Sequence, residues 1–345
     1  MRVEKILIRG PNWVGDAVLA IPAMKAVRAH FTQAEITLLV RPWVAGLFTS
    51  APFIDKVWSE SRPSSLLDWI RITREIRTRR FNLALLFPNS FESALMTFLG
   101  RVPQRVGYAT DGRTWMLTNA IAPSAKARHQ VHYYLDIVRT LSVKAEQPSI
   151  AIEATNEERA AARTLLASEG IPPEAPFLVV NPGAAYGSAK RWAEDRFAEV
   201  ADVLAREMGL QVAIVGSEAE RPIAEQIRKR MKSRTAILNG KTTLETLIGV
   251  LAESTLIITN DSGPMHIAAA LGVPTVAVFG STDEKVTGPY GPRTRIVKHP
   301  VECSPCLLRE CPIDHRCMTR VAVEDVCRAA RELLGHAPLS RNWMS

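Results

Sequence analysis

The sequence has no long apolar run. No stretch approaches the roughly 18 uninterrupted apolar residues that a bilayer span needs, so we expect no membrane-spanning segment. The chain starts with MRVEKILIRG, which turns directly into a short strand and lacks the apolar stretch and cleavage site of a secretory signal. This start favours a cytosolic protein. Short-period repeats and low-complexity tracts are also absent, and collagen-like, coiled-coil and disordered chains are excluded.

The composition is that of an ordinary globular protein. Hydrophobic residues make up 47% of the 345 residues and charged residues 23%. Since a domain typically has about 150 residues, a chain of this length predicts two domains. The net charge is +8, and it is unevenly distributed. Residues 1–170 carry 22 basic and 15 acidic side chains, whereas residues 171–345 carry 21 basic and 20 acidic ones. The basic half favours an anionic partner, such as a phosphorylated substrate, an acidic lipid surface or nucleic acid, although an ordinary basic surface is an alternative.

Short apolar runs alternate with amphipathic segments along the whole chain. This alternation predicts an α/β fold with two doubly wound parallel sheets. Three prolines in residues 170–176 indicate a linker, so we expect domains at 1–170 and 171–345. Strands are expected at 5–9, 35–40, 54–58, 82–87, 177–181, 211–215, 236–238, 255–259 and 275–279. Ligands of such sheets bind at the loops that follow the strands.

The first of these loops is GPNWVGD at residues 10–16. Asp16 follows it at or near a helix start, where its carboxylate could accept a proton from a substrate hydroxyl. A helix N-cap is the alternative, since Asp is common there. A helix N-terminus also favours the ionised carboxylate and weakens the base, unless Trp13 and Val14 desolvate it.

A second loop, NPGAAYGSAKRW at residues 181–192, follows the first strand of the second half. Its small residues leave backbone amides free to cradle phosphate oxygens, and Lys190 can neutralise their charge. The spacing is not that of a Walker A loop. The alternative is a glycine-rich turn with solvated Lys190 and Arg191.

Two further loops carry polar residues at strand ends. NDSGPMH at 260–266 suits either a ligand contact or a helix cap followed by a core histidine. Glu218 and Glu220 follow another strand, where an acid can hold ribose hydroxyls or simply occupy the first turn of a helix.

Four cysteines lie close together near the C-terminus, at Cys303, Cys306, Cys311 and Cys317, with His315 among them. Their density indicates a candidate structural metal site, although the spacing fits neither common zinc pair. Reduced thiols or a redox-sensitive clip are the alternatives, and disulfides are not expected in the cytosol.

Four segments together resemble the ADP-heptose:lipopolysaccharide heptosyltransferases, most of all the heptosyltransferase II branch: GPNWVGDAV at 10–18, FPNSFESAL at 87–95, GAAYGSAKRW at 183–192 and NDSGPMHIAAA at 260–270. The resemblance implies a GT-B fold, in which two Rossmann-like domains face each other across a cleft. The acceptor would bind the N-terminal domain and the sugar nucleotide the C-terminal one. The last helix is a candidate to pack back on the N-terminal domain.

The resemblance also implies an inverting transfer that needs no metal or other cofactor. Asp16 would be the base and Lys190 the catalytic phosphate-binding cation. Donor contacts would come from Ala185, Tyr186, Ser188, Thr242, Asp261, Ser262, Gly263 and His266, with the ribose on Glu218 or, as the weaker candidate, Glu220.

The implied partners are ADP-heptose and a phosphorylated inner-core–lipid A acceptor, at the cytoplasmic face of the inner membrane, with peripheral membrane contact and no nucleic acid. Heptosyltransferase I, acting on Kdo-lipid A, and a GT-B sugar-nucleotide epimerase are the alternatives. Candidate acceptor contacts are Asn12 and Trp13. Loop position alone adds the cations Arg41, Arg62, Arg105, Arg113 and Lys126.

Overall fold

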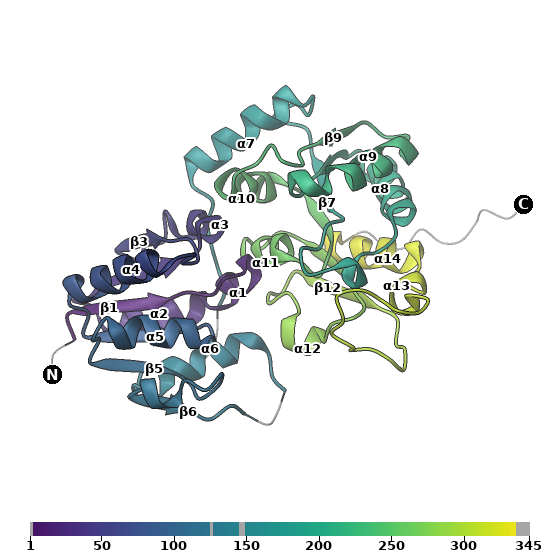
Figure 1. Cartoon of the computed structure of the whole chain (residues 1–345). Helices are drawn as coiled ribbons and strands as arrows, with labels where there is room; N and C mark the ends of the chain where they lie inside the picture. Colours follow the sequence, from purple (N-terminus) through teal and green to yellow (C-terminus); the bar gives the residue numbers. More distant parts are fainter. Residues whose placement is uncertain (1–2, 125–126, 145–148, 336–345) are drawn as a thin grey trace, which may run out of the picture. The chain divides into compact units, whose positions relative to one another are not determined.

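A computed structural model describes residues 3–124, 127–144 and 149–335 of the chain. The chain divides into two compact units, Met1–Ile150 and Ala151–Ser345, coloured purple to blue and teal to yellow in Figure 1. Each unit holds one six-stranded sheet in which every neighbouring pair is parallel. The doubly wound fold class predicted from the alternating pattern is therefore confirmed.

The first unit has the strand order β3-β2-β1-β4-β5-β6. Its strands are β1 (Lys5–Arg9), β2 (Glu35–Val40), β3 (Lys56–Ser59), β4 (Leu83–Leu86), β5 (Gln104–Tyr108) and β6 (Asn119–Ile121). Its helices are α1 (Val14–Leu19), α2 (Ile21–His30), α3 (Pro42–Ala45), α4 (Leu66–Arg79), α5 (Phe91–Leu99) and α6 (Gln130–Arg139), with short 3-10 turns η1 (Gly46–Phe48) and η2 (Thr114–Met116).

The second unit repeats this order as β12-β11-β10-β7-β8-β9. Its strands are β7 (Phe177–Asn181), β8 (Gln211–Ile214), β9 (Thr235–Ile237), β10 (Leu256–Asn260), β11 (Thr275–Phe279) and β12 (Thr294–Lys298). Its helical segments are α7 (Asn156–Ser168), η3 (Ser188–Lys190), α8 (Glu194–Met208), η4 (Glu218–Glu220), α9 (Arg221–Arg230), α10 (Leu244–Glu253), α11 (Gly263–Ala270), α12 (Glu284–Thr287), α13 (Arg316–Thr319) and α14 (Val323–Leu334).

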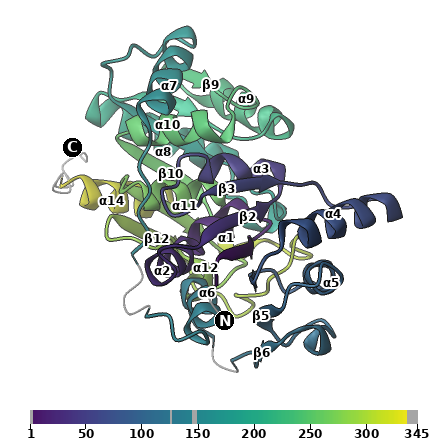
Figure 2. The ribbon, with the colours of Figure 1, turned by 90° about the vertical axis from the view of Figure 1, so that its left-hand side faces the viewer.

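Each sheet is buried because apolar side chains point to both of its faces. In the first unit, Ile72 and Ile76 of α4 and Ala94 of α5 pack on one face against alternate strand residues such as Leu7 and Leu86. Figure 2 shows α4 and α5 on one side of this unit, and α2 packs with α6. In the second unit, α8, α9 and α14 form a single core with alternate residues of β7, β8, β10 and β11.

The unit boundary lies earlier than the 170/171 boundary that the prolines indicated. Helix α7 packs on α10 of the second unit so closely that a Cβ on Gly249 would lie 2.1 Å from the Glu158 carbonyl oxygen. Arg159 and Arg163 of α7 also pair with Glu253 of α10. The proline-rich segment is therefore a loop inside the second unit.

With the boundary at 150/151, the difference in net charge between the two parts of the chain is larger than with the predicted boundary. Residues 1–150 carry 20 basic and 11 acidic side chains, a net of +9, whereas residues 151–345 carry 23 and 24, a net of −1. The first unit is therefore the basic one.

The last described helix, α14, packs within the second unit. The apolar face of α14, which includes Val326, Cys327 and Ala330, is buried against α8, β11 and β12. That face is occupied within its own unit. Among the described residues, no helix is long and apolar enough to cross a membrane.

Both sheets reverse their strand order beside their first strand, between β1 and β4 and between β7 and β10. In open parallel sheets, the loops on either side of such a point diverge and leave a crevice for a ligand at the carboxyl ends of the strands. The loops with the sequence motifs at 10–16, 87–91, 181–192 and 260–266 follow these four strands.

Candidate functional site

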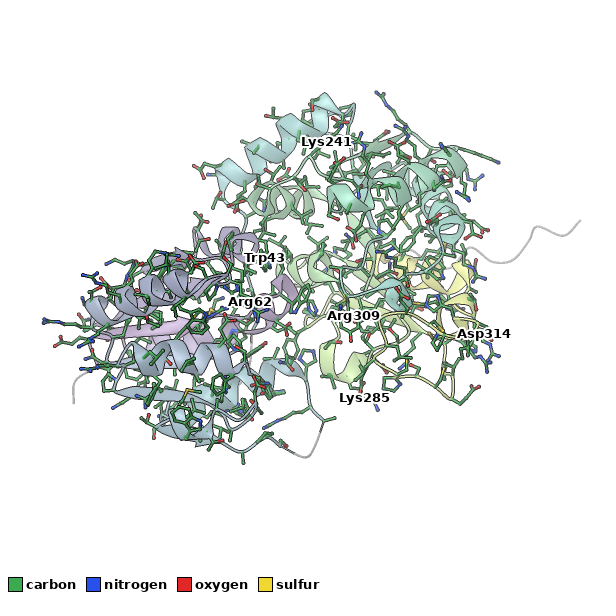
Figure 3. The ribbon with its side chains drawn as sticks, in the orientation of Figure 1. Trp43, Arg62, Lys241, Lys285, Arg309 and Asp314 are labelled. Carbon is green, nitrogen blue, oxygen red and sulfur yellow. The ribbon has the colours of Figure 1, made fainter. Side chains whose placement is uncertain are left out.

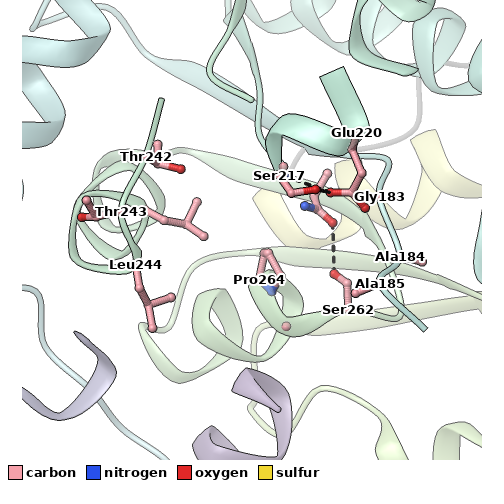
Figure 4. Close-up of a pocket in the computed structure, with 14 residues that line it drawn as sticks. Gly183, Ala184, Ala185, Ser217, Glu220, Thr242, Thr243, Leu244, Ser262 and Pro264 are labelled. Atoms are coloured by element: carbon pink, nitrogen blue, oxygen red, sulfur yellow. Dashed lines mark hydrogen bonds between the residues drawn. The ribbon is translucent and has the colours of Figure 1, made fainter. Parts of the chain in front are cut away.

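A pocket in the second unit opens where its strand order reverses (Figure 4). Loops that follow β7, β8, β9 and β10 all contribute to it. Its lining residues are Asn181, Gly183, Ala184, Ala185, Gly216, Ser217, Glu220, Thr242, Thr243, Leu244, Leu247, Ser262, Gly263 and Pro264. The pocket therefore collects four of the expected donor residues, Ala185, Thr242, Ser262 and Gly263.

The start of α11 forms one wall of this pocket. Ser262 is the N-cap residue, but its side chain makes no cap hydrogen bond. Its hydroxyl instead donates to Asn181 Oδ1 at 3.0 Å, as Figure 4 shows. A helix N-terminus without a side-chain cap has amide groups and a partial positive charge available for an anion.

Lys190 is held in an ion pair. Its Nζ lies 2.6 Å from Asp261 Oδ2, and the Thr282 hydroxyl donates to the same oxygen at 2.7 Å. The side chains of Lys190 and Asp261 are only 14% and 5% exposed. The Tyr186 ring lies 5.0 Å from Nζ. The alternative of a solvated Lys190 is therefore wrong, and Asp261 is its positioning partner.

Asn260 fastens both ends of the loop that carries Lys190. Its Nδ2 donates to the Pro182 carbonyl at 2.8 Å, and its Oδ1 accepts from the Trp192 amide at 3.0 Å. Both contacts are buried. Sequence reasoning missed this residue, although it begins the NDSGPMH motif.

The two candidate ribose acids are separated by the structure. Glu220 lines the pocket, and its Oε2 accepts from the Ser217 amide and hydroxyl at 2.9 and 2.8 Å. Glu218 does not line it; its side chain is 71% exposed and faces Arg221. A Cβ on Gly183 would lie 2.2 Å from Glu220 Oε1, so this glycine allows the acid to approach the loop. Glu220, the weaker candidate in the sequence prediction, is therefore the acid of the two that lines the pocket.

The other expected donor residues lie near the pocket lining but are not part of it. Tyr186 and Ser188 are exposed in the loop that carries Lys190, and the Tyr186 hydroxyl donates to the Leu307 carbonyl at 2.8 Å. His266 is buried in α11, with 6% of its surface exposed.

The cysteine-containing segment braces this loop from outside. The Ala189 amide donates to the Arg309 carbonyl at 2.9 Å, and His315 Nε2 lies 2.9 Å from the Ala189 carbonyl oxygen. A Cβ on Gly187 would lie 2.2 Å from the Arg309 carbonyl oxygen. The two segments are therefore packed backbone to backbone.

The cysteines themselves carry free thiols. Cys303 and Cys306 are exposed, whereas Cys317 is buried. Burial, and then repulsion from Cys303, Cys306 and Cys311, raises the pKa of the Cys317 thiol. Within residues 3–124, 127–144 and 149–335, no three His, Cys, Asp or Glu side chains are grouped so that they could hold a metal ion. The cysteine arrangement therefore does not fit the candidate metal site.

In the first unit, Asp16 lies in the first turn of α1 as its third residue. The N-cap residue is Trp13, so Asp16 is not the N-cap. The buried Tyr134 hydroxyl donates to Asp16 Oδ1 at 3.2 Å. Burial, and then the Asp16 charge, raises the pKa of Tyr134 well above its usual value, so this phenol stays protonated. Sequence reasoning missed Tyr134, which α6 supplies from far along the chain.

The loop before Asp16 is shaped by Arg9 and Trp43. Arg9 donates to Asn12 Oδ1 at 2.6 Å, and Trp43 Nε1 donates to the Asn12 carbonyl at 2.8 Å. Burial, and then the charge of Arg41, lowers the pKa of Arg9 to about 9. Trp13 and Trp43 are 55% and 58% exposed. Asn12 is therefore engaged in the loop, and the two indoles give it an apolar rim.

Glu92 joins two of the expected acceptor arginines. It lies in the first turn of α5, and its two oxygens pair with Arg41 at 2.7 Å and Arg62 at 3.1 Å. Arg41 is buried, whereas the Arg62 side chain is 80% exposed (Figure 3). Arg62 is the cation of this group that an anionic substrate can reach. Glu92 was also missed, although it lies in the FPNSFESAL segment.

Two other arginines do not suit the expected role. Arg113 is fully buried and donates to the Tyr108 carbonyl and the Ser93 hydroxyl. Through these hydrogen bonds it supports the loops around β4 and β5. Arg105 lies at the amino end of β5, the opposite edge from the Asp16 loop, and donates to the Met116 carbonyl. Lys126 lies outside the described residues.

Comparison with known proteins identifies the family. The model of glycosyltransferase family 9 (heptosyltransferase) matches residues 69–316. The chain belongs to this heptosyltransferase family. The resemblance seen in the four sequence motifs is thus confirmed.

Named relatives and a solved structure support this assignment. The lipooligosaccharide heptosyltransferase 2 of Campylobacter jejuni is 31% identical over 97% of this chain and 100% of its own length. The lipopolysaccharide heptosyltransferase 2 of Salmonella typhimurium is 30% identical over 85% of this chain and 88% of its own. The structure of E. coli ADP-heptose lps heptosyltransferase II superposes with a TM-score of 0.81 and 25% identity, covering 96% of this chain and 98% of that one. The two sheets of this heptosyltransferase are therefore those of the GT-B fold.

Proposed function

We propose that this heptosyltransferase moves L-glycero-D-manno-heptose from ADP-heptose to the first heptose of the lipopolysaccharide inner core. The similarity to heptosyltransferase 2 proteins over nearly the whole chain supports this choice of acceptor. The single structural observation that carries the proposal is the pocket at the strand-order reversal, with the uncapped start of α11 in its wall.

The donor would bind in this pocket through its ADP group. The apolar and small residues beside Thr242 suit the adenosine, and Glu220, which lines the pocket, would accept hydrogen bonds from ribose hydroxyls. The diphosphate would meet the α11 N-terminus and the amides of the 183–188 loop. Lys190 would add its charge on exchanging part of its contact with Asp261 for a phosphate oxygen.

The acceptor would bind the first unit, with Asp16 as the base. Asp16 takes the proton of the acceptor hydroxyl while that oxygen forms a bond to the anomeric carbon of the heptose. The bond from this carbon to the diphosphate oxygen breaks on the opposite side, so the configuration inverts and ADP leaves with the electron pair. Tyr134 would orient the carboxylate through its hydrogen bond.

The proposed step uses only charges that the chain supplies. Lys190 and the helix N-terminus stabilise the negative charge that grows on the leaving diphosphate. The phosphorylated acceptor and its lipid A anchor place the reaction at the cytoplasmic face of the inner membrane. Nucleic acid has no part in it.

An acceptor assay tests this proposal. Purified protein is given ADP-heptose with inner core ending in one heptose, with Kdo-lipid A, or with no acceptor, and ADP release is measured. We expect rapid release only with the one-heptose core, and the same rate in EDTA. Preference for Kdo-lipid A would show a heptosyltransferase I instead, and conversion of the nucleotide sugar without acceptor would show an epimerase.

A further inference from the structure

The first turns of α4 expose three large apolar side chains. Leu66, Leu67 and Ile70 have 75%, 77% and 52% of their surface accessible. Single exposed apolar residues are common on proteins, but three on adjacent turns of one helix form a patch that favours a binding partner.

This patch belongs to a face of α4 that the fold does not use. Ile72 and Ile76 are fully buried on the opposite face, where they anchor the helix to the sheet. At 3.6 residues per turn, Leu66, Leu67, Ile70, Arg74 and Arg77 lie within about 100° of one another around the helix axis. We call these five residues the outer face of α4. It is apolar at the start of the helix and cationic toward its end.

The charge of this outer face is not neutralised by neighbours. Residues 60–80 hold six arginines and three acids, a net of +3. Glu60 pairs with Arg71, Glu75 pairs with Arg79, and Asp68 closes the capping box with Ser65. In the part of the chain that the structure describes, neither Arg74 nor Arg77 is in an ion pair. Their guanidinium groups remain available to an anionic surface.

The position of α4 connects this face with the proposed acceptor site. The segment between β3 and α4 leaves the carboxyl edge of the sheet, where the Asp16 loop also lies. Arg62 in that segment pairs with Glu92, which also holds Arg41. In Figure 2, α4 runs to the right-hand side of the view, with α5 beneath it. A surface bound to the outer face would therefore lie beside the acceptor edge of this unit.

We propose that the outer face of α4 docks on an anionic phospholipid bilayer. Leu66, Leu67 and Ile70 enter the boundary between headgroups and acyl chains, and Arg74 and Arg77 meet lipid phosphates. The boundary of a bilayer has an apolar layer of acyl chains and an anionic layer of lipid phosphates. The exposed leucines and isoleucine suit the first layer, and the arginines that follow them suit the second. The inference rests on the proposed function, because a lipid-anchored acceptor gives this docking its purpose.

Vesicle sedimentation tests the docking without any substrate. The full chain is mixed with phosphatidylglycerol/phosphatidylethanolamine vesicles or with phosphatidylcholine vesicles. We expect at least fivefold stronger partition to the anionic vesicles. Leu67→Glu should weaken that partition about tenfold, and Arg74→Gln/Arg77→Gln should remove the preference for anionic lipid. Leu99→Glu is the matched control, since Leu99 is 49% exposed on the neighbouring helix α5, and it should stay within twofold of the parent.

Equal partition of the Leu67→Glu and Leu99→Glu variants would overturn the docking surface. So would a parent protein that sediments as a dimer while Leu67→Glu is monomeric, because a second copy would then cover the outer face. Both substitutions are at exposed positions, and thermal unfolding checks that the variants are folded.

Turnover separates this inference from the proposed function. With a deacylated, water-soluble one-heptose acceptor, Leu67→Glu should match the parent; with the lipid-linked acceptor in anionic vesicles, its KM should rise about tenfold. An unchanged KM on vesicles would reject the docking and leave the transferase proposal standing. If the parent bound the vesicles but transferred no heptose, the transferase proposal would be rejected and the docking would stand.

Discussion

At the scale of single residues, the Asp16 carboxylate depends on a partner from the far end of its unit. Tyr134 is buried and protonated, and it donates to one carboxylate oxygen. A carboxylate that is held in one orientation can take a proton in line with the attack on the donor.

Replacing Asp16 by Asn tests this role. Asn keeps the size of the side chain but cannot accept the proton. We expect kcat to fall by roughly 100-fold or more, with donor affinity unchanged, because the donor pocket lies in the other unit. Steady-state kinetics and ADP-heptose titration measure the two quantities. Glu4→Gln, an exposed acid beside the amino end of β1, serves as the control, and a near-normal kcat for Asp16→Asn would reject Asp16 as the base.

At the scale of elements, the loop that carries Lys190 is positioned by two segments that are distant in sequence. Asn260 holds its ends, and the backbone of Arg309 and the ring of His315 hold its middle. The cysteine-rich segment thus supports the loop by its backbone path. The segment therefore has a structural role in which none of its thiols takes part.

Gly187→Ala should disturb that support. The added Cβ would lie 2.2 Å from the Arg309 carbonyl oxygen, so one backbone must move. We expect ADP to bind about tenfold more weakly, measured by calorimetry. Gly209→Ala is the control: it places a Cβ in open space at a left-handed position after α8, and should cost about 1 kcal/mol of stability without changing ADP affinity. Equal affinities for the two variants would show that the brace does not position the loop.

The packing of α14 predicts a pH dependence of stability. Burial raises the pKa of the Cys327 thiol from 9.0 to about 12. Above pH 9 the thiol ionises in the unfolded chain but not in the folded one, so the free energy of unfolding should fall as pH rises from 9 toward 12. The loss attributable to this group is about 1 kcal/mol per pH unit.

Urea denaturation from pH 8 to 10.5 measures this dependence. Cys327→Ala should be less stable than the parent at pH 8, because it leaves a small cavity, but its stability should fall less steeply above pH 9. Parallel curves for the two proteins would show that the thiol is not the responsible group.

At the scale of the whole molecule, charge is divided between the units. The first unit carries a net +9 and the second −1. Under the proposed function, the first unit as a whole would attract an anionic acceptor, whereas donor binding would depend on local groups in one pocket.

Salt should therefore act differently on the two substrates. Raising the ionic strength from about 0.05 to 0.5 M shortens the Debye length severalfold and screens long-range attraction. We expect the acceptor KM to rise at least fivefold and the donor KM to change less than twofold. The reverse pattern in steady-state kinetics would show that the acceptor does not bind the basic unit.

Much of this architecture follows from local pattern. Buried strands such as β7 and β11 are continuous apolar runs that end in turn residues, and parallel strands place those turns on one edge of the sheet. The loops around Asp16 and Lys190 could thus be recognised from the chain alone. The strands β5, β6 and β12 were not predicted. β6 and β12 are edge strands with polar or partly exposed residues, and β5 begins with the polar, partly exposed Gln104 and Arg105, so none of the three is a continuous apolar run.

The sequence by itself determined the fold class, the family and the loops that carry the family's motifs, since these depend on residue order over short distances. Only the tertiary structure decided the partners of those residues. It paired Tyr134 with Asp16, Asp261 with Lys190 and Glu92 with two arginines, and it buried Arg113. Each of these outcomes depends on how segments far apart in the chain meet, and periodicity along one segment holds no information about that.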